Sequence, residues 1–154
     1  MALFSTSQGN DVPHCHIPDF PCEEKNFTAA EVQAARDWMA LHFPKTVEIR
    51  VPSLRYNCHG YAYADAHGWF DEPDLFIADD FSEVPLASPQ KDDVVLYMNG
   101  GVLMHSAVIK SVSRGSIKKL RSKWGGGPAV THDLADVPAV YGNPVHLLRR
   151  NAAS

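Results

Sequence analysis

The sequence predicts an α+β fold, because segments with helical periodicity come first in the chain and segments with strand periodicity follow. Residues 29–43 and a region beginning at Cys58 carry the helix signals, and residues 94–149 have the pattern of successive strands joined by turns. Strands and helices do not alternate, so a parallel sheet is not expected. With 154 residues, 45% of them hydrophobic, the chain can bury the core of one domain.

The domain is expected to occupy residues 27–150. Residues 1–26 are rich in Pro, Asp and Ser and lack periodicity, which indicates an irregular N-terminal arm, and residues 151–154 form a tail. The first ten residues contain neither a basic cluster nor an apolar run, so no secretory signal is visible. We therefore expect a cytoplasmic protein, or one that is exported without a cleaved signal peptide.

The first regular element predicted is an amphipathic helix over residues 29–43. Thr28 and Glu31 have the spacing of a capping box, in which each side chain accepts a hydrogen bond from the backbone N–H of the other residue. Apolar residues recur at helical spacing as far as Phe43, and Pro44 ends the pattern.

A short strand and a second helix follow. Residues 46–51 alternate between apolar and polar side chains, as a half-buried strand does. Asn57 is a suitable N-cap for a helix that begins at Cys58 and ends near Gly68. Residues 71–91 contain three prolines and many acidic residues, so we expect a loop with room for one short helix.

The remaining segments predict an antiparallel sheet. The longest segment is apolar on both faces, which is typical of a strand in a central position. The predicted strands are 94–97, 102–112, 117–124, 132–134 and 145–149. Turns that contain glycine separate the first three of them, which favours hairpin connections.

Composition excludes several classes of function. The net charge is −4 and the pI about 6.0, so no basic excess favours nucleic acid. No apolar run approaches the roughly 20 residues that a membrane span requires. Cys15, Cys22 and Cys58 are an odd number of cysteines, which argues against a disulfide framework. No cofactor motif is present, since the glycines at 125–127 lack the Lys-Ser/Thr of a phosphate loop.

Cys58 is the candidate nucleophile. In the first turn of a helix, free backbone N–H groups and the positive end of the helix dipole favour the thiolate, which is the reactive form. The same N–H groups can stabilise the oxyanion of an acyl-transfer intermediate, helped by a group such as Asn57 or Tyr56. His59 and His67 lie on other faces of the same predicted helix, so the base must come from another element.

His105 is the candidate base, since it lies in the predicted central strand among apolar neighbours and requires a polar partner there. A turn at residues 114–115 places Ser122 diagonal to His105 on the same face, where its hydroxyl can orient the ring. A register shifted by one residue substitutes Lys123, which only donates hydrogen bonds. His132 is the other candidate for this third position, and another group, or none, stays an open alternative.

Several short motifs, taken in order, resemble those of a poorly characterised bacterial domain family. They are Asn57-Cys58-His59-Gly60-Tyr61-Ala62, Asp93-Val94-Val95-Leu96-Tyr97, His105-Ser106-Ala107, Ser122-Lys123-Trp124-Gly125, His132, Tyr141-Gly142 and Arg149-Arg150. The matching stretch is roughly residues 55–150, about two-thirds of the chain. That family in turn resembles the branch of the papain-like superfamily that contains cell-wall amidases.

The resemblance implies a papain-like α+β domain, in which the helix that bears the cysteine packs on a central antiparallel sheet. It gives Cys58 the position of the nucleophile and His105 that of the base, with Ser122 or His132 in the third position. Cell-wall amidases of this type usually carry His, Asn or Gln there, so a serine departs from their pattern. The catalytic candidates are Cys58, His105 and Ser122, and the binding candidates are Tyr56, Asn57, Lys123 and His132.

The expected function is that of a cysteine-dependent acyl hydrolase, a peptidase, amidase or deamidase, which acts through a Cys-His thiolate and a thioester without a cofactor. Its substrate is expected to be a peptide, a protein or another amide. The small size and the absent leader suit a bacterial effector or toxin, whose partner is an immunity protein or a host target. A catalytically inactive binding module on the same fold is the alternative.

Two further segments have competing interpretations. Residues 14–22 contain two histidines and two cysteines, so a small zinc-binding interaction protein is a further hypothesis, although the spacing matches no standard zinc knuckle. Lys119, Arg121 and Lys123 share one face of the predicted strand 117–124. We expect that face to be solvated, with a surface for an anionic substrate or partner as the alternative.

Overall fold

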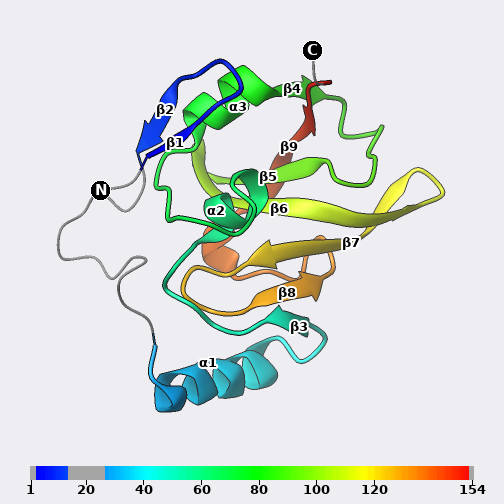
Figure 1. Ribbon diagram of the computed structural model, residues 1–154. Helices are drawn as coiled ribbons and strands as arrows, with labels where there is room; N and C mark the ends of the chain where they lie inside the picture. Colours follow the sequence, from blue (N-terminus) through cyan, green and yellow to red (C-terminus); the bar gives the residue numbers. More distant parts are fainter. Residues whose placement is uncertain (1–2, 14–26, 153–154) are drawn as a thin grey trace.

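A computed structural model describes residues 3–13 and 27–152, and it has the expected α+β architecture around a seven-stranded antiparallel sheet (Figure 1). In spatial order the strands are β3 (Val47–Arg50), β8 (Ala129–His132), β7 (Ser116–Lys123), β6 (Val102–Ser113), β5 (Val94–Asn99), β9 (Asn143–Arg150) and β4 (Phe81–Val84). The other elements are the hairpin β1 (Leu3–Ser5) and β2 (Asp11–Pro13), helices α1 (Ala29–His42), α2 (Cys58–Tyr63) and α3 (Asp74–Asp80), and the 3-10 turn η1 (Ala139–Tyr141). Within these ranges, no helix has the length and apolar character needed to cross a membrane.

The long strand β6 occupies the middle of the sheet, as the sequence predicts. Its hairpin with β7 turns at Arg114 and Gly115, which both have positive φ. The two strands pair from Ser113–Ser116 to Val108–Arg121 in the predicted register, except at Ser111, which pairs with Lys119 in an irregularity of the ladder. The β6–β7 ladder ends there, while β7 continues to Lys123 alongside β8. The candidate site lies at this end of the two strands.

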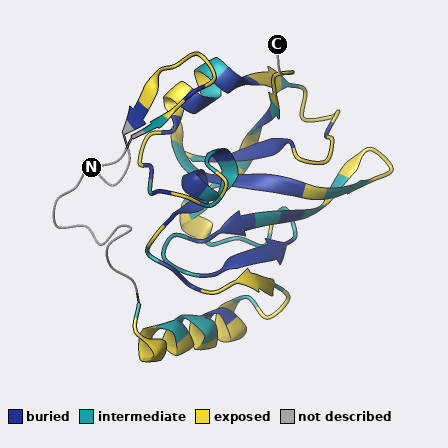
Figure 2. Cartoon of the chain, viewed as in Figure 1, coloured by how far each residue is buried: buried dark blue, intermediate teal, exposed yellow. Residues whose placement is uncertain are grey.

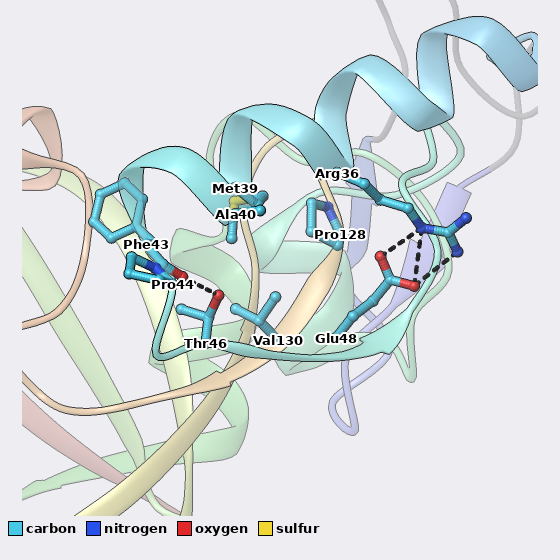
Figure 3. Close-up of a pocket in the computed structure, with 9 residues that line it drawn as sticks. All are labelled: Arg36, Met39, Ala40, Phe43, Pro44, Thr46, Glu48, Pro128 and Val130. Carbon is cyan, nitrogen blue, oxygen red and sulfur yellow. Dashed lines mark hydrogen bonds and ion pairs between the residues drawn. The ribbon is translucent and has the colours of Figure 1, made fainter.

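Helix α1 covers the end of the sheet that β3 and β8 form (Figure 1). The predicted capping box at its N-terminus is present, with both reciprocal hydrogen bonds. Its buried side chain is Met39, which packs with Trp124 and Val130. Figure 3 shows a hollow between the helix and these strands, across which Arg36 forms an ion pair with Glu48 of β3 at 2.8 Å.

Helix α2 is shorter than predicted. It ends at Tyr63, and Asp65 and Ala66 then adopt φ values of 52° and 62°, so the chain leaves the helix before Gly68. The returning backbone passes close to Gly60, where a Cβ would lie 2.0 Å from the carbonyl oxygen of Gly68. Only glycine fits at position 60, which explains the glycine two residues after the candidate nucleophile.

Part of the N-terminal arm is regular, so the prediction of an irregular segment is wrong for residues 3–13. The hairpin β1–β2 is held to the end of α3 by side chains of that helix. The Thr6 hydroxyl donates to Asp79 at 2.5 Å, and the backbone N–H of Ser7 donates to Asp80 at 3.0 Å. Residues 14–26 lie outside the described ranges.

The segment predicted as a loop, 71–91, contains more structure than expected. Helix α3 accounts for the short helix, and β4 follows it directly as an edge strand paired with β9. The strand predicted at 132–134 is β8, which begins three residues earlier. The other strands agree with the prediction apart from their ends.

Both faces of the sheet are covered, and Figure 2 shows the buried residues concentrated in the central strands. One core lies between the sheet and α2 and α3, and it includes Tyr63 and Phe70. The other lies on the opposite face and includes Tyr97 and Leu120, with Tyr141 of η1 packed against it. The candidate site includes residues from both faces of the sheet.

Candidate active site

The residues before α2 place Cys58 at the first position of the helix. Asn57 caps the helix as predicted: its Oδ1 accepts hydrogen bonds from the N–H groups of Gly60 at 3.0 Å and Phe70 at 3.2 Å. Its Nδ2 donates to the Phe70 carbonyl at 2.7 Å. These buried bonds fix the start of the helix, where Cys58 is a free, buried thiol.

The surroundings of the Cys58 thiol act on its pKa in two directions. Burial is the largest influence and raises the pKa of Cys58 to about 11. Hydrogen bonds from the backbone N–H groups of Ser106 and His59 act in the opposite direction, as does the charge of Lys123. The start of the helix therefore favours the thiolate as expected, but desolvation outweighs it.

A hollow of about 220 Å³ opens onto this thiol, whose residue is only 6% exposed. Its walls come from the start of α2, the segment 69–71, the beginning of β6, the turn after β7, and η1. The residues that contribute beside Cys58 include Trp69, Asp71, Met104, Gly125 and Tyr141. A small molecule in this hollow would therefore lie beside Cys58.

His105 lies one residue before Ser106, whose N–H contacts the thiol. Its imidazole is fully buried and stacks on Tyr141, with the ring centroids 4.1 Å apart and the planes inclined by 3°. Among the described residues, neither ring nitrogen has a hydrogen-bond partner. Cys58 and His105 are thus not hydrogen-bonded here. Burial, with the neighbouring His132 and His59 as further causes, holds the pKa of His105 well below its usual value.

The sequence predicts that Ser122 orients His105, but the structure places Ser122 on His132 instead, with Oγ 2.7 Å from Nε2. Nδ1 of His132 lies 2.8 Å from the carbonyl oxygen of Asp133, so Nδ1 carries the proton and Nε2 accepts. The indole N–H of Trp124 donates to Ser122 at 3.0 Å. This chain of hydrogen bonds is complete without His105.

Lys123 is fully buried, so the prediction that it faces solvent is wrong. Its Nζ donates to the carbonyl oxygens of Ser53 at 2.6 Å, Tyr56 at 3.0 Å and Gly125 at 2.5 Å. Three acceptors match the three donors of an ammonium group. Burial lowers the pKa of Lys123 to about 7, and the nearby Cys58 opposes that shift. The side chain ties the segment before α2 to the turn after β7.

Neither side chain predicted to assist the oxyanion is placed for that role. The amide of Asn57 is engaged with Phe70. The Tyr56 hydroxyl accepts a hydrogen bond from Arg50, and its ring lies under the Lys123 ammonium at 4.7 Å. Backbone N–H groups around Cys58 are therefore the donors that the site offers.

Sequence reasoning missed a buried polar cluster beside the thiol. Nδ1 of His59 and the hydroxyl of Tyr63 each lie 3.0 Å from Oγ of Ser106. Burial lowers the pKa of His59 to about 4. Residues 59 and 63 are four apart on α2, a spacing that predicts a shared helix face. Their common partner on β6 depends on how helix and sheet pack, which no local pattern contains.

The part of the chain that the structure describes holds no group of three or more His, Cys, Asp or Glu side chains suited to a metal ion. The zinc ligands hypothesised at 14–22 lie outside that part, so that hypothesis stays untested. No family model matches the chain, and neither a curated protein nor a solved structure matches it.

Proposed function

We propose that this protein is a cysteine-dependent acyl hydrolase of papain-like fold, with Cys58 as nucleophile and His105 as general base. One observation carries the proposal: a fully buried imidazole with two unpartnered nitrogens lies one residue from the N–H that contacts a buried thiol. An unpaired buried polar group costs about 1–3 kcal/mol. A general base needs such a free nitrogen to accept a proton.

The link between the thiol and His105 is Tyr141. Side chains of successive strand residues point to opposite faces, so Ser106 faces α2 and His105 faces η1. The β6–β7 ladder ends at the pair Val108–Arg121, and the thiol contacts β6 at the N–H of Ser106, beyond that pair. Tyr141 lines the hollow at Cys58 and stacks on His105, so it adjoins both groups. In the proposal, the Cys58–His105 hydrogen bond forms when substrate fills the hollow.

In the proposed mechanism, Cys58 and His105 both start from their neutral forms. A free nitrogen of His105 takes the thiol proton as Sγ attacks the carbonyl carbon of an amide, and the carbonyl electron pair moves to oxygen. The N–H groups around Cys58 donate to the oxygen on which negative charge develops, and Lys123, in its protonated form, adds a nearby positive charge. His105 then protonates the leaving amine as the C–N bond breaks, which leaves a thioester. Water, deprotonated by His105, hydrolyses this thioester and restores the thiol.

A non-catalytic binding module on the same fold is the second candidate, because the pKa of Cys58, raised to about 11, suits an inert cysteine. The hollow would then hold a peptide or protein group without covalent chemistry. Action as a bacterial effector, against a host target or with an immunity partner, stays a prediction under either function.

The test is acylation of Cys58 by p-nitrophenyl acetate in a Cys15→Ser, Cys22→Ser background, where Cys58 is the sole thiol. We expect a stoichiometric burst of p-nitrophenolate and an acetyl adduct on Cys58 in the mass spectrum. His105→Ala should slow the burst by about 10²–10⁴-fold. Added imidazole should restore part of that rate, which a purely structural role would not produce. A Cys58 that stays unmodified in the folded protein contradicts the proposal and favours the binding module.

A further inference from the structure

A second hollow, of about 270 Å³, adjoins the one that opens onto Cys58. Its walls come from α1, the turn after β7 and the segment around η1. They include Ala35, Trp38, Met39, Trp124, Pro128 and Tyr141. None of the described residues that line it carries a charge, so a ligand there meets apolar side chains and glycine or proline backbone.

The two hollows are lined in part by the same segments of the chain. Tyr141 lines both of them. The turn after β7 also borders both, through Gly125 on the Cys58 side and through Gly127 and Pro128 on the α1 side. The two hollows therefore meet at Tyr141 and at this turn.

The wall between the hollows is held in place before any ligand binds. Tyr141 stacks on His105. The Trp124 indole N–H donates a hydrogen bond to Ser122 at 3.0 Å, and its ring lies edge-on to Phe43 with the ring centroids 4.7 Å apart. Prearranged aromatic walls reduce the entropy that binding costs. Trp38, on the outer side, is 47% exposed and has apolar area left to bury.

We infer that the second hollow is the subsite for an apolar group of the substrate, an aliphatic or aromatic chain attached to the carbonyl that Cys58 attacks. The inference rests on the proposed function and adds the substrate class to it. Each methylene buried there should raise the acylation rate about fourfold when the contact is made in the transition state. A charged group is disfavoured, because the lining residues leave it unpaired.

A series of p-nitrophenyl acetate, butyrate and hexanoate tests the inference in the background in which Cys58 is the sole cysteine. Rates of Cys58 acylation are divided by the rates with N-acetylcysteine, which removes the intrinsic reactivity of each ester. We expect this ratio to rise with chain length until the hollow is filled. Mass spectrometry of the intact protein identifies the acyl group on Cys58.

Variants on α1 then locate the subsite. Ala35→Phe fills the hollow and should abolish the preference for longer esters while acetate still reacts. Trp38→Ala, a surface change that the fold tolerates more easily, should weaken the same preference. Leu41→Ala is the matched control, since Leu41 is 76% exposed on the same helix and does not line the hollow. Thermal melting verifies that each variant is folded.

The outcomes separate the two proposals. If acetate acylates Cys58 but the ratio does not rise with chain length, the subsite is wrong and the hydrolase stands. The same conclusion follows if Ala35→Phe and Trp38→Ala leave the preference as large as Leu41→Ala does. If no ester acylates Cys58, the proposed function fails and the subsite fails with it.

Discussion

The two faces of the central sheet carry similar polar clusters that differ in one residue. On the α2 face, Ser106 is hydrogen-bonded with His59, and on the η1 face Ser122 is hydrogen-bonded with His132. Both of these histidines are buried, and burial lowers the pKa of each. His105 belongs to the η1 face and is buried as deeply, yet among the described residues its nitrogens have no partner. Hydrogen bonding, and not burial, therefore distinguishes His59 and His132 from His105, the residue proposed as the general base.

Replacing the two histidines of the η1 face by phenylalanine should give the largest contrast. His105→Phe removes two unpartnered nitrogens and keeps a ring against Tyr141, so the free energy of unfolding should stay the same or rise by about 1–3 kcal/mol. Acylation of Cys58 should fall about 10²–10⁴-fold. His132→Phe leaves the Ser122 hydroxyl without its acceptor and should cost about 1–3 kcal/mol.

Urea unfolding and the p-nitrophenyl acetate burst measure the two effects separately. A His105→Phe protein destabilised as strongly as His132→Phe, with its burst intact, would show that His105 is an ordinary core residue.

Acid should destabilise the fold through the histidine of the α2 face. The pKa of His59 is near 6.5 when unfolded and about 4 when folded. Between these values the unfolded state binds a proton that the folded state does not, so the free energy of unfolding falls as the pH drops. The slope for one such group reaches about 1.4 kcal/mol per pH unit. His105 and His132, whose pKa values are also lowered, add to it.

Urea midpoints at several pH values between 7 and 4 measure this slope. His59→Gln removes one titrating group and should flatten the curve in that window. An unchanged curve would mean that His59 does not contribute to acid lability.

A methyl group at position 60 should disrupt the α2 face specifically. In Gly60→Ala the new Cβ overlaps the carbonyl oxygen of Gly68, 2.0 Å away, and the backbone must move. We expect a loss of about 1–3 kcal/mol and a higher rate of Cys58 alkylation, because the helix start shifts away from β6. Gly100→Ala is the control: a Cβ there meets nothing within 4 Å, and only the positive φ of 58° opposes it. Equal losses in both variants would argue against the close approach.

Removing the charge of Lys123, on the α2 face, should give the smallest effect. Lys123→Met removes the ammonium near Cys58, so the pKa of the thiol should rise further and alkylation at pH 6 should slow. The pKa of Lys123 is about 7, so the unmodified protein loses this charge as the pH rises beyond that value. The alkylation rates of Lys123→Met and of the unmodified protein should therefore converge at higher pH.

Iodoacetamide labelling across this pH range, with thermal melting alongside, separates charge from structure. A rate difference that is the same at every pH would indicate that Lys123 acts only by holding its three carbonyl partners.

Features that depend on neighbours in the sequence could be predicted. The capping box at Thr28 and the Asn57 cap are local patterns, and both are formed. The register of the β6–β7 hairpin follows from its tight turn at Arg114, and the pair Val108–Arg121 confirms it. Together these place the candidate nucleophile at a helix start and the candidate base on the central strand.

Features that depend on pairs distant in the sequence could not be predicted. Ser122 bonds to His132 because β8 pairs with β7, and no local pattern gives that strand order. Lys123 is buried because its ammonium reaches three carbonyls from other segments. Hydrophobic alternation treats a lysine as solvated unless such acceptors are known. The hairpin at residues 3–13 depends likewise on the end of α3.

The strand order also determines when the thiol becomes protected during synthesis. Val47 pairs with Thr131 and Phe81 pairs with Arg150, so two early strands wait for partners made much later. Ribosomes add about 5–20 residues per second, which leaves these segments unpaired for several seconds. We expect Cys58 to stay accessible to solvent until β6, whose Ser106 contacts the thiol, has joined the sheet. Pulsed labelling of Cys58 in nascent chains should therefore report when this part of the sheet has formed around the thiol.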